Sequence, residues 1–308
     1  MKTLAIGIDI GGTRTKMGLV DLWAGQVLET LIYPTETTDA CRFEQTLGEG
    51  IATFREAARK RQTSIVGAGI GVSGFVFDDG SVDSTYGFMP FLDNYPLAQR
   101  IETRFGLRCR VDNDARLVAL GEAVFGQGKG HRRVLVLTLG TGLGVGFVVD
   151  QKLDGRLPYG HMSGHITVAT SDLICYCGKT GCLESLVSAT GLVEAAKRVN
   201  WPEKYSHLPL TAKQIFRESM AGNPDAQALV AQLLAYLKIG LDTYVNLFAP
   251  NIIILGGGVA KGLKPYLADW STNAVLGPYM TYQVILATST LDEQSGILGS
   301  AFLFNDEN

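Results

Sequence analysis

Three of the five cysteines in this chain fall within eight positions, at Cys175, Cys177 and Cys182, and His165 precedes them. One imidazole and three thiolates satisfy tetrahedral Zn²⁺ and leave no position for a catalytic water. Buried free thiols are the alternative, and a redox pair is disfavoured because a single residue separates Cys175 from Cys177. The spacing therefore predicts a closed structural zinc that holds a loop in shape.

Glu184 stands two residues beyond the last of these cysteines, so the same loop would fix its position. A histidine that gives one ring nitrogen to zinc holds the other as an N–H donor, which is able to point at a ligand hydroxyl. We therefore expect His165 to face a ligand while the cysteines hold the loop.

Three glycine-rich turns each follow a predicted strand, at residues 9–13, 139–144 and 256–258. Such turns offer backbone N–H groups at close range, as phosphate oxygens require. A single instance is more often only a tight turn, and neither the Walker pattern nor the dinucleotide fingerprint is present in full. Three turns in one chain favour a nucleotide cleft over coincidence.

Asp114 lies where a short strand gives way to a helix, in the segment Val111-Asp112-Asn113-Asp114-Ala115. An isolated Asp at such a junction more often caps the helix. The alternative is a general base, because phosphoryl transfer to an alcohol needs a group that accepts the hydroxyl proton while the γ-phosphate is held in line. The residues alone leave both roles open.

Short apolar strands and amphipathic helices alternate along the chain. In the first half we expect strands at 4–10, 16–20, 27–33, 65–72 and 109–111, the first three as a meander, and helices at 43–61 and 115–125. In the second half we expect strands at 134–139, 144–149, 252–255 and 284–287, a helix from Pro224 to about 248 capped by Asn223, and a closing helix at 297–304. This alternation favours an α/β fold.

The composition favours a small or neutral ligand. The 308 residues, 46% of them hydrophobic, suffice for one large domain or two ordinary ones. A formal net charge of -3 provides no basic field for nucleic acid or anionic lipid. No apolar run approaches the roughly 20 residues of a membrane span. The first apolar run reads as a strand and not as a signal peptide, and five cysteines fit a cytosolic protein better than a disulfide framework.

Together these segments resemble the ROK family of bacterial sugar kinases and related proteins, in the actin/hexokinase superfamily, over essentially the whole chain. GIDIGGTRTKMGLVD is similar to the family's first phosphate motif, LTLGTGLGVGFVVD to its second, NDARLVALGE to its catalytic segment and LGGGV to its adenosine-side turn. GHITVATSDLICYCGKTGCLE resembles the zinc signature and is the most diagnostic piece.

The resemblance implies a two-domain actin-like ATPase fold of ribonuclease H-like type, with the active site in an interdomain cleft. It implies an N-terminal α/β domain at residues 1–112, completed by a C-terminal helix within 293–308, and a larger C-terminal domain at 113–292 that carries the zinc loop. The implied reaction transfers the γ-phosphoryl group of ATP, with Mg²⁺, to a hydroxyl of a hexose or hexose derivative. A glucokinase- or fructokinase-like cytoplasmic homodimer without nucleic-acid or membrane partners is expected.

The resemblance also assigns roles to individual residues. Asp114 is the base, and the residues expected to bind the sugar are Asn113, Asp114, His165, Glu184 and Gly74. The residues expected on the nucleotide side are Asp9, near the Mg²⁺, and Gly11, Gly12, Thr13, Thr141, Gly142, Gly257 and Gly258. The zinc ligands are His165, Cys175, Cys177 and Cys182.

Three positions depart from the family's pattern. In the family, the segment that ends at the zinc histidine usually reads G-E-x-G-H, and its glutamate contacts the sugar. Met162 stands at that glutamate's position here. The family also usually has an asparagine near Phe88 and another at the position of Arg116. Methionine accepts no strong hydrogen bond. We therefore expect a changed substrate with an apolar or substituted group facing Met162, Phe88 and Phe91, with drift around an ordinary hexose site as the alternative. His161 or Arg116 could restore a polar contact.

Two other functions are weighed against a kinase. The family includes transcriptional repressors, which carry a helix-turn-helix before the kinase-like body. Here the first strand begins close to the first residue, and the net charge does not suit a DNA-binding face. The second is a non-catalytic sugar sensor of the same fold, against which the presence of Asp114 argues.

Overall fold

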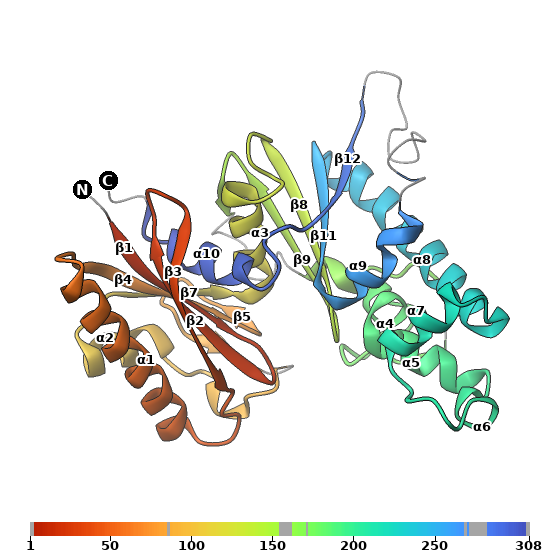
Figure 1. Ribbon diagram of the computed structural model, residues 1–308, viewed down its shortest axis with the longest axis horizontal. Coiled ribbons are helices and arrows are strands. Elements are labelled where there is room, and N and C mark those ends of the chain that lie inside the picture. Colours follow the sequence, from red (N-terminus) through yellow and green to blue (C-terminus); the bar gives the residue numbers. More distant parts are fainter. Residues whose placement is uncertain are drawn as a thin grey trace. The chain divides into compact units, whose positions relative to one another are not determined.

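A computed structural model describes residues 3–84, 87–153, 162–170, 172–267, 270 and 282–305 of the protein. The chain divides into two compact units, each with its own sheet and core (Figure 1). The first comprises Met1–Gly130, Val148–His161 and Leu291–Asn308, and the second comprises His131–Phe147 and Met162–Thr290. Both units combine helices with strands, so the expected α/β class is confirmed.

The first unit is built on a five-stranded sheet in the order β3-β2-β1-β4-β7. Its strands are β1 (Leu4–Ile10), β2 (Arg14–Asp21), β3 (Gln26–Pro34), β4 (Ile65–Val72) and β7 (Cys109–Asn113). The first three pair antiparallel, as the predicted meander requires, whereas β4 pairs parallel with β1 and β7 parallel with β4. The carboxyl ends of β1, β4 and β7 therefore share one edge, and Gly11, Gly74 and Asp114 follow these three ends.

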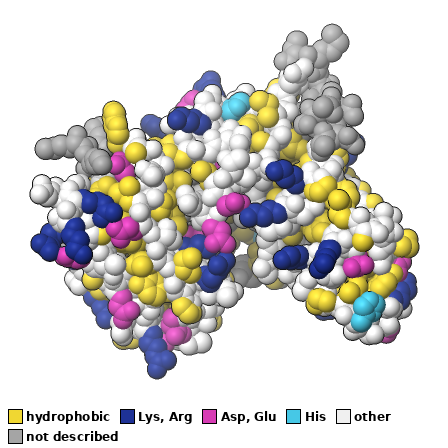
Figure 2. Space-filling view, viewed as in Figure 1, with side chains coloured by type: hydrophobic (Ala, Val, Ile, Leu, Met, Phe, Trp, Pro, Cys, Tyr) yellow, Lys and Arg dark blue, Asp and Glu magenta, His cyan; other side chains and the backbone are white. Residues whose placement is uncertain are grey.

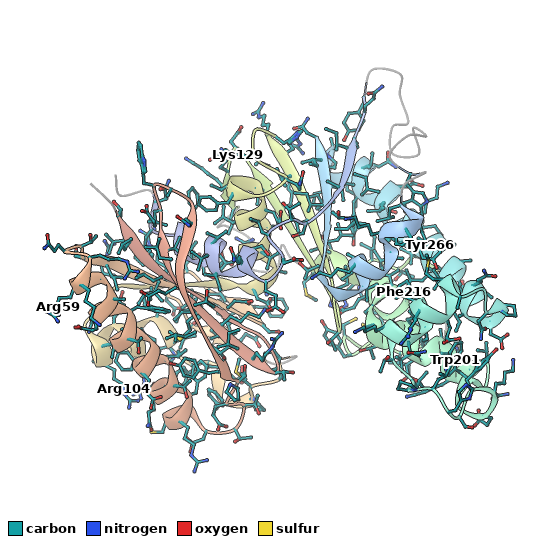
Figure 3. All side chains as sticks on the ribbon, viewed as in Figure 1. Arg59, Arg104, Lys129, Trp201, Phe216 and Tyr266 are labelled. Atoms are coloured by element: carbon teal, nitrogen blue, oxygen red, sulfur yellow. The ribbon has the colours of Figure 1, made fainter. Side chains whose placement is uncertain are left out.

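Helices cover this sheet and tie its outer parts together. They are α1 (Ala40–Lys60), α2 (Leu97–Phe105), α3 (Asp114–Phe125) and α10 (Gln294–Phe302), with a short η1 (Pro90–Leu92) and a hairpin of β5 (Phe75–Val76) and β6 (Val82–Asp83). Glu44 of α1 is fully buried and accepts hydrogen bonds from Arg100 at 2.7 Å and from Arg104, which is labelled in Figure 3, at 2.5 Å. Burial would raise the pKa of Glu44, but these bonds and one from Tyr95 hold it at about 2. The buried charge thus fastens α2 to α1.

The closing helix α10 approaches β1 and α3 backbone to backbone. A Cβ atom on Gly7 would lie 1.9 Å from the carbonyl oxygen of Ile297, and one on Gly299 would lie 1.8 Å from that of Leu117. No side chain fits in such a contact, so glycine is required on both faces of α10. The contact fixes α3, which begins with Asp114, against the first unit.

The second unit is built on a sheet in the order β10-β9-β8-β11-β12. Its strands are β8 (Arg133–Leu139), β9 (Leu143–Val149), β10 (Lys152–Leu153), β11 (Ile252–Gly256) and β12 (Ile285–Thr288), and β10 with the end of β9 falls in the residues grouped with the first unit. β8, β11 and β12 are parallel. The glycine turns at 140–142 and 257–258 follow the carboxyl ends of β8 and β11, which are neighbours in this sheet.

The helices of the second unit form its larger core. They are α4 (Leu183–Val187), α5 (Ala189–Arg198), α6 (Trp201–Lys204), α7 (Ala212–Met220), α8 (Pro224–Phe248) and α9 (Gly257–Leu263), with the turns η2 (Met162–His165) and η3 (Lys264–Tyr266). Trp201 and Phe216, labelled in Figure 3, are buried in that core. α8 begins as predicted, because the Asn223 side chain accepts the N–H groups of Asp225 and Ala226 and Pro224 occupies the first turn.

α8 is also the one helix among the described residues that is long and apolar enough to cross a membrane, by length and composition only. Its buried side chains, including those of Leu233, Leu237, Leu241 and Tyr244, belong to the core of the second unit. A core helix passes the same test of length and composition.

The first unit extends further than the expected boundary at residue 112. It runs to Gly130 and takes in Val148–His161, and the second unit begins at His131. The reason is the close contact of α3 with α10, which keeps α3 in the first unit. The helices α2, α4, α5, α6, α7 and α9 were not predicted.

Charges of both signs are interspersed on the visible surface. On the face shown in Figure 2, Lys and Arg side chains lie among Asp and Glu side chains in both units. This mixture agrees with the formal net charge of -3 and provides no extended basic field on that face.

Candidate active site and metal centre

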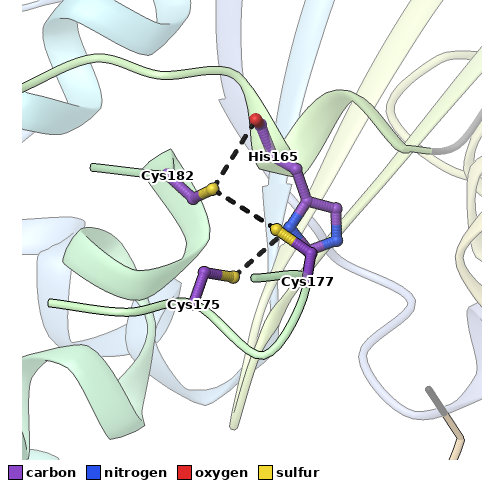
Figure 4. A group of neighbouring side chains, drawn as sticks. All are labelled: His165, Cys175, Cys177 and Cys182. Carbon is purple, nitrogen blue, oxygen red and sulfur yellow. Dashed lines mark hydrogen bonds between the residues drawn. The ribbon is translucent and has the colours of Figure 1, made fainter. Parts of the chain in front are cut away.

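The predicted zinc ligands converge in the second unit (Figure 4). The ligand atoms of His165, Cys175, Cys177 and Cys182 all lie within 4.8 Å of one another. Nδ1 of His165 is 3.5 Å from Sγ of Cys175, and Sγ of Cys177 is 3.7 Å from Sγ of Cys182. Segments from η2, the 175–177 loop and the start of α4 bring them together.

These distances fit a tetrahedral metal. Zn–S bonds of about 2.3 Å and a Zn–N bond of about 2.0 Å set ligand atoms about 3.5–3.8 Å apart at the corners of a tetrahedron. The two short edges of the observed group match that spacing. Three sulfurs and one imidazole nitrogen are the donor set of a structural zinc site, and they leave no coordination position for a substrate.

The backbone of the η2 turn that carries His165 is held at two carbonyl groups. Its carbonyl oxygen accepts a hydrogen bond from Nζ of Lys179 at 3.0 Å, and Tyr244 of α8 donates to the carbonyl of Ser163 in the same η2 turn at 2.7 Å. Nδ1 faces the cysteines, so Nε2 is the ring nitrogen that the cluster does not use. In the structure, Nε2 lies 3.1 Å from the hydroxyl of Tyr176.

Glu184 joins the zinc loop to the second glycine turn. Its Oε1 accepts the N–H of Leu143 at 3.1 Å, and a Cβ on Gly142 would lie 2.3 Å from the same oxygen. Its Oε2 is buried and has no hydrogen-bond partner within the part of the chain that the structure describes, although Nδ1 of His165 is 3.4 Å away. Burial raises the pKa of Glu184, and the N–H of Leu143 opposes that rise. An unmatched buried acceptor suits a ligand hydroxyl.

The glycine turns of the second unit expose backbone. The N–H of Gly140 bonds to the carbonyl of Gly142 at 2.9 Å, and the hydroxyl of Thr190 holds the carbonyl of Thr141 at 2.9 Å. Thr141 itself is exposed. Gly257 has φ +88°, and a Cβ there would meet the Leu139 carbonyl oxygen at 2.3 Å, which explains the glycine. At Gly258 a Cβ would meet nothing within 4 Å, so this backbone is open to a ligand.

Asn113, and not Asp114, caps α3. Its Oδ1 accepts the N–H groups of Ala115 at 3.0 Å and of Arg116 at 3.2 Å, and its amide donates to the carbonyl of Gly74 at 3.1 Å. Asn113 is buried, so most of its hydrogen-bonding capacity is already used. Gly74 has φ +122°, a conformation that favours glycine. The cap therefore fixes Asp114 at the first position of the helix and leaves its carboxylate for another role.

The carboxylate of Asp114 is poised near neutral pH. One oxygen accepts the N–H of Ala115 at 2.8 Å. Burial raises the pKa of Asp114 to about 6, and the negative charge of Asp9 adds to the rise. A base whose pKa lies near the working pH accepts protons efficiently while remaining ionised.

Asp9 lies in a charged network beside the first glycine turn. Burial raises its pKa, which Lys16 opposes from 3.4 Å. Lys16 in turn lies 3.9 Å from Glu293, which pairs with Arg14 at 2.8 Å. Neither Lys16 nor Glu293 was predicted as a site residue. The one sequence signal for Lys16 was a basic residue on the strand after the first glycine turn, and Glu293 had none.

The first glycine turn joins β1 to β2. The N–H of Gly11 donates to the carbonyl of Arg14 at 3.1 Å, and the hydroxyl of Thr35 donates to the Gly11 carbonyl at 2.7 Å. Gly12 and Thr13 are exposed at the tip. A Cβ on Gly12 would lie 3.8 Å from the ring of Phe88, so this aromatic residue lies beside the turn.

The other residues that depart from the family's pattern have separate surroundings. Met162 opens η2, is partly buried, and lies three residues before His165. Arg116 is buried and pairs with Asp112 at 2.7 Å, so its charge is matched by the strand β7 that precedes its helix. His161 lies outside the described residues.

Comparison with known proteins places these features in a family. The ROK family matches residues 5–307. A glucokinase of Streptomyces coelicolor is 35% identical over 97% of this chain and 97% of its own length. A crystal structure of a ROK family glucokinase from Streptomyces griseus in complex with glucose and AMPPNP is 30% identical, with a TM-score of 0.80 over 98% of this chain and 99% of that one. A putative xylose repressor of Caldicellulosiruptor is 30% identical over 79% of this chain but only 63% of its own length.

Proposed function

The chain belongs to the ROK family and has its actin-like ATPase fold, and from that premise we propose that it is an ATP-dependent carbohydrate kinase. The observation that carries the proposal is Asp114, a carboxylate with a pKa of about 6 that the Asn113 cap leaves available. A sugar sensor has no need of such a base.

In the proposed reaction Asp114 accepts the proton of a sugar hydroxyl. The hydroxyl oxygen forms a bond to the γ-phosphorus of ATP as the bond from that phosphorus to the bridging oxygen breaks, and ADP leaves. Mg²⁺ bound with the nucleotide would neutralise phosphate charge, and Asp9 offers a carboxylate of the kind that holds it. The turn residues Gly11, Gly12, Thr13, Thr141, Gly142, Gly257 and Gly258 are proposed to contact the nucleotide.

The sugar is proposed to bind through His165 and Glu184. Nε2 of His165 would donate to one hydroxyl, and the buried Oε2 of Glu184 would accept from another, which satisfies an otherwise unmatched oxygen. Asn113 has one amide proton left after its bond to Gly74, so its contribution is smaller than the sequence suggests.

Zinc is proposed to hold this arrangement. It would be bound by His165, Cys175, Cys177 and Cys182. It would fix the loop that precedes Glu184 and keep Nε2 of His165 protonated as a hydrogen-bond donor. The metal takes no part in the transfer. A cytoplasmic homodimer is retained as part of the proposal, and light scattering tests the oligomeric state.

Release of ADP in a coupled assay over a sugar panel tests the proposal directly. The panel contains free hexoses, amino and N-acetyl sugars, glycosides and polyols. Turnover of at least one sugar, with its phosphate ester found by mass spectrometry, is expected. Sugar binding without any ADP release would favour the sensor.

The pH dependence of kcat/KM is expected to follow the ionisation of Asp114. Because the base must be ionised, log kcat/KM should be level above pH of about 6 and fall by one unit per pH unit below it. The residual activity of Asp114→Asn should show no such limb. A wild-type rate that stays constant down to pH of about 5 would contradict the assignment.

Free glucose is expected to be a poor substrate because Met162 offers no acceptor to a hydroxyl, and a buried unpaired hydroxyl is heavily penalised. A sugar that is deoxygenated, acylated or glycosidically substituted on that side should react better. Met162→Glu should raise kcat/KM for glucose, by about tenfold, the low end of one hydrogen bond to a charged group. Met220→Glu, at an exposed position in the same unit, is the control. Efficient wild-type glucose phosphorylation that Met162→Glu leaves unchanged or reduces would refute the prediction.

A further inference from the structure

Tyr176 lies in the sequence between two proposed zinc ligands, Cys175 and Cys177. Its hydroxyl nevertheless lies beside the nitrogen of His165 that is proposed to face the sugar. The oxygen lies 3.1 Å from Nε2 of His165, and the two rings meet edge to face with centroids 5.1 Å apart. Nε2 is the ring nitrogen that does not face the cysteines.

Glu184 lies beside the other nitrogen of the same imidazole. Its Oε2 is 3.4 Å from Nδ1 of His165, whereas the Tyr176 hydroxyl lies next to Nε2. Tyr176 therefore faces the ring nitrogen that is proposed to donate to the sugar, and Oε2 of Glu184 has no hydrogen-bond partner among the described residues. A phenolic hydroxyl donates and accepts one hydrogen bond each, as a sugar hydroxyl does.

The ring of Tyr176 is nevertheless poorly anchored. The residue is 58% exposed, whereas His165 and Glu184 are buried. The backbone beside it turns at Gly178, with φ +85°. Removing the phenol from the site therefore costs little packing, and the main loss is its contact with His165.

We propose that the Tyr176 hydroxyl is a built-in competitor, which occupies the position of the sugar hydroxyl that would bind Nε2 of His165 and is displaced when the sugar binds. The inference rests on the proposed function for the identity of the ligand. It predicts that part of the binding free energy of the sugar is spent on replacing Tyr176. A ligand without a hydroxyl at that point leaves the phenol in place.

Tyr176→Phe tests the inference because it removes the oxygen and keeps the ring. Calorimetric titration with the sugars of the panel, followed by steady-state kinetics, should show Kd and KM lower by about three- to tenfold, the equivalent of one ordinary hydrogen bond, with kcat unchanged. Zinc content and Tm should equal those of the wild type. Tyr236→Phe, a tyrosine on α8 of the same unit, should change none of these values.

A series of monodeoxy analogues of the preferred sugar gives the sharper result. Tyr176→Phe should improve the binding of every member except the one that lacks the hydroxyl read by His165. An equal gain for all members would indicate steric relief and overturn the inference, as would an unchanged or raised Kd. Sugars that bind without being phosphorylated would contradict the proposed function, while their Kd values would still test Tyr176. Failure of every sugar to bind would contradict both.

Discussion

Replacement of Asp114 by asparagine is expected to lower kcat by about 10²–10⁴-fold, the usual contribution of a general base. Asparagine keeps the size of the side chain and its bond to the N–H of Ala115, but it has no carboxylate to accept the sugar proton. The fold should survive, because Asn113 supplies the cap of α3. Nucleotide affinity should change little, since other turns are proposed to hold the phosphates. Single-turnover measurement of phosphoryl transfer, beside titration with a non-hydrolysable ATP analogue, separates the two effects.

Asp78→Asn is the matched control for this experiment. Asp78 is an exposed acid in the same unit, so its replacement removes the same charge without touching the site. Its kcat should equal that of the wild type. Near wild-type turnover by Asp114→Asn would show that the base lies elsewhere or that none is needed.

Loss of one zinc ligand is expected to have the largest effect on stability. Purified protein should carry about one tightly bound Zn²⁺ per chain. Cys177→Ser should lose most of it, and Tm should fall by about 5–15 °C, because structural zinc contributes several kcal/mol of folding free energy or more. Activity should fall with it, since the loop that positions His165 and Glu184 would no longer be fixed. Metal analysis and calorimetry measure both quantities.

Cys41→Ser provides the comparison, because Cys41 is exposed and lies outside the cluster. Its zinc content, Tm and activity should match those of the wild type. Wild-type protein that is stable and active without zinc, or a Cys177→Ser variant with full zinc content, would contradict the proposed metal site.

The sequence predicted the strands and helices whose ends are marked by nearby residues. The apolar runs of β1 and β4 end at glycines or small residues, so their limits were visible, and the Asn-Pro pair marked the start of α8. α2 follows Pro96 without a side-chain cap. It is held instead by the ion pairs of Arg100 and Arg104 with Glu44, which lie far away in the sequence.

The first unit of the structure extends past residue 112 for a similar reason. α3 looks like the first helix after a strand and gives no sign of its partner. Its partner is α10, near the other end of the chain, and the fit depends on the absence of a Cβ at Gly299. A glycine in an apolar helix predicts some close contact, but not with which element.

The candidate site was predicted in its residue types more than in its geometry. The spacing of His165 and the three cysteines anticipated the cluster that the structure contains, because four ligands of these types have few alternative uses. The sequence left open whether Asp114 caps α3 or acts as a base, and the structure gives the cap to Asn113 through its hydrogen bonds from Ala115 and Arg116. The position of the Tyr176 hydroxyl depends on how the loop folds back.

Glu184 gives the second unit a property that none of its parts has alone. One oxygen fixes the N–H of Leu143 at the end of the 140–142 turn, and the other is the acceptor proposed for the sugar. A sugar hydroxyl that donates to Oε2 would orient the Glu184 carboxylate, which holds the proposed phosphate turn. A phosphate bound at that turn would orient Oε2 in return. The two affinities are then coupled by one factor that is the same in both directions. The proposed sugar site and the proposed phosphate turn would thus influence one another through a single carboxylate.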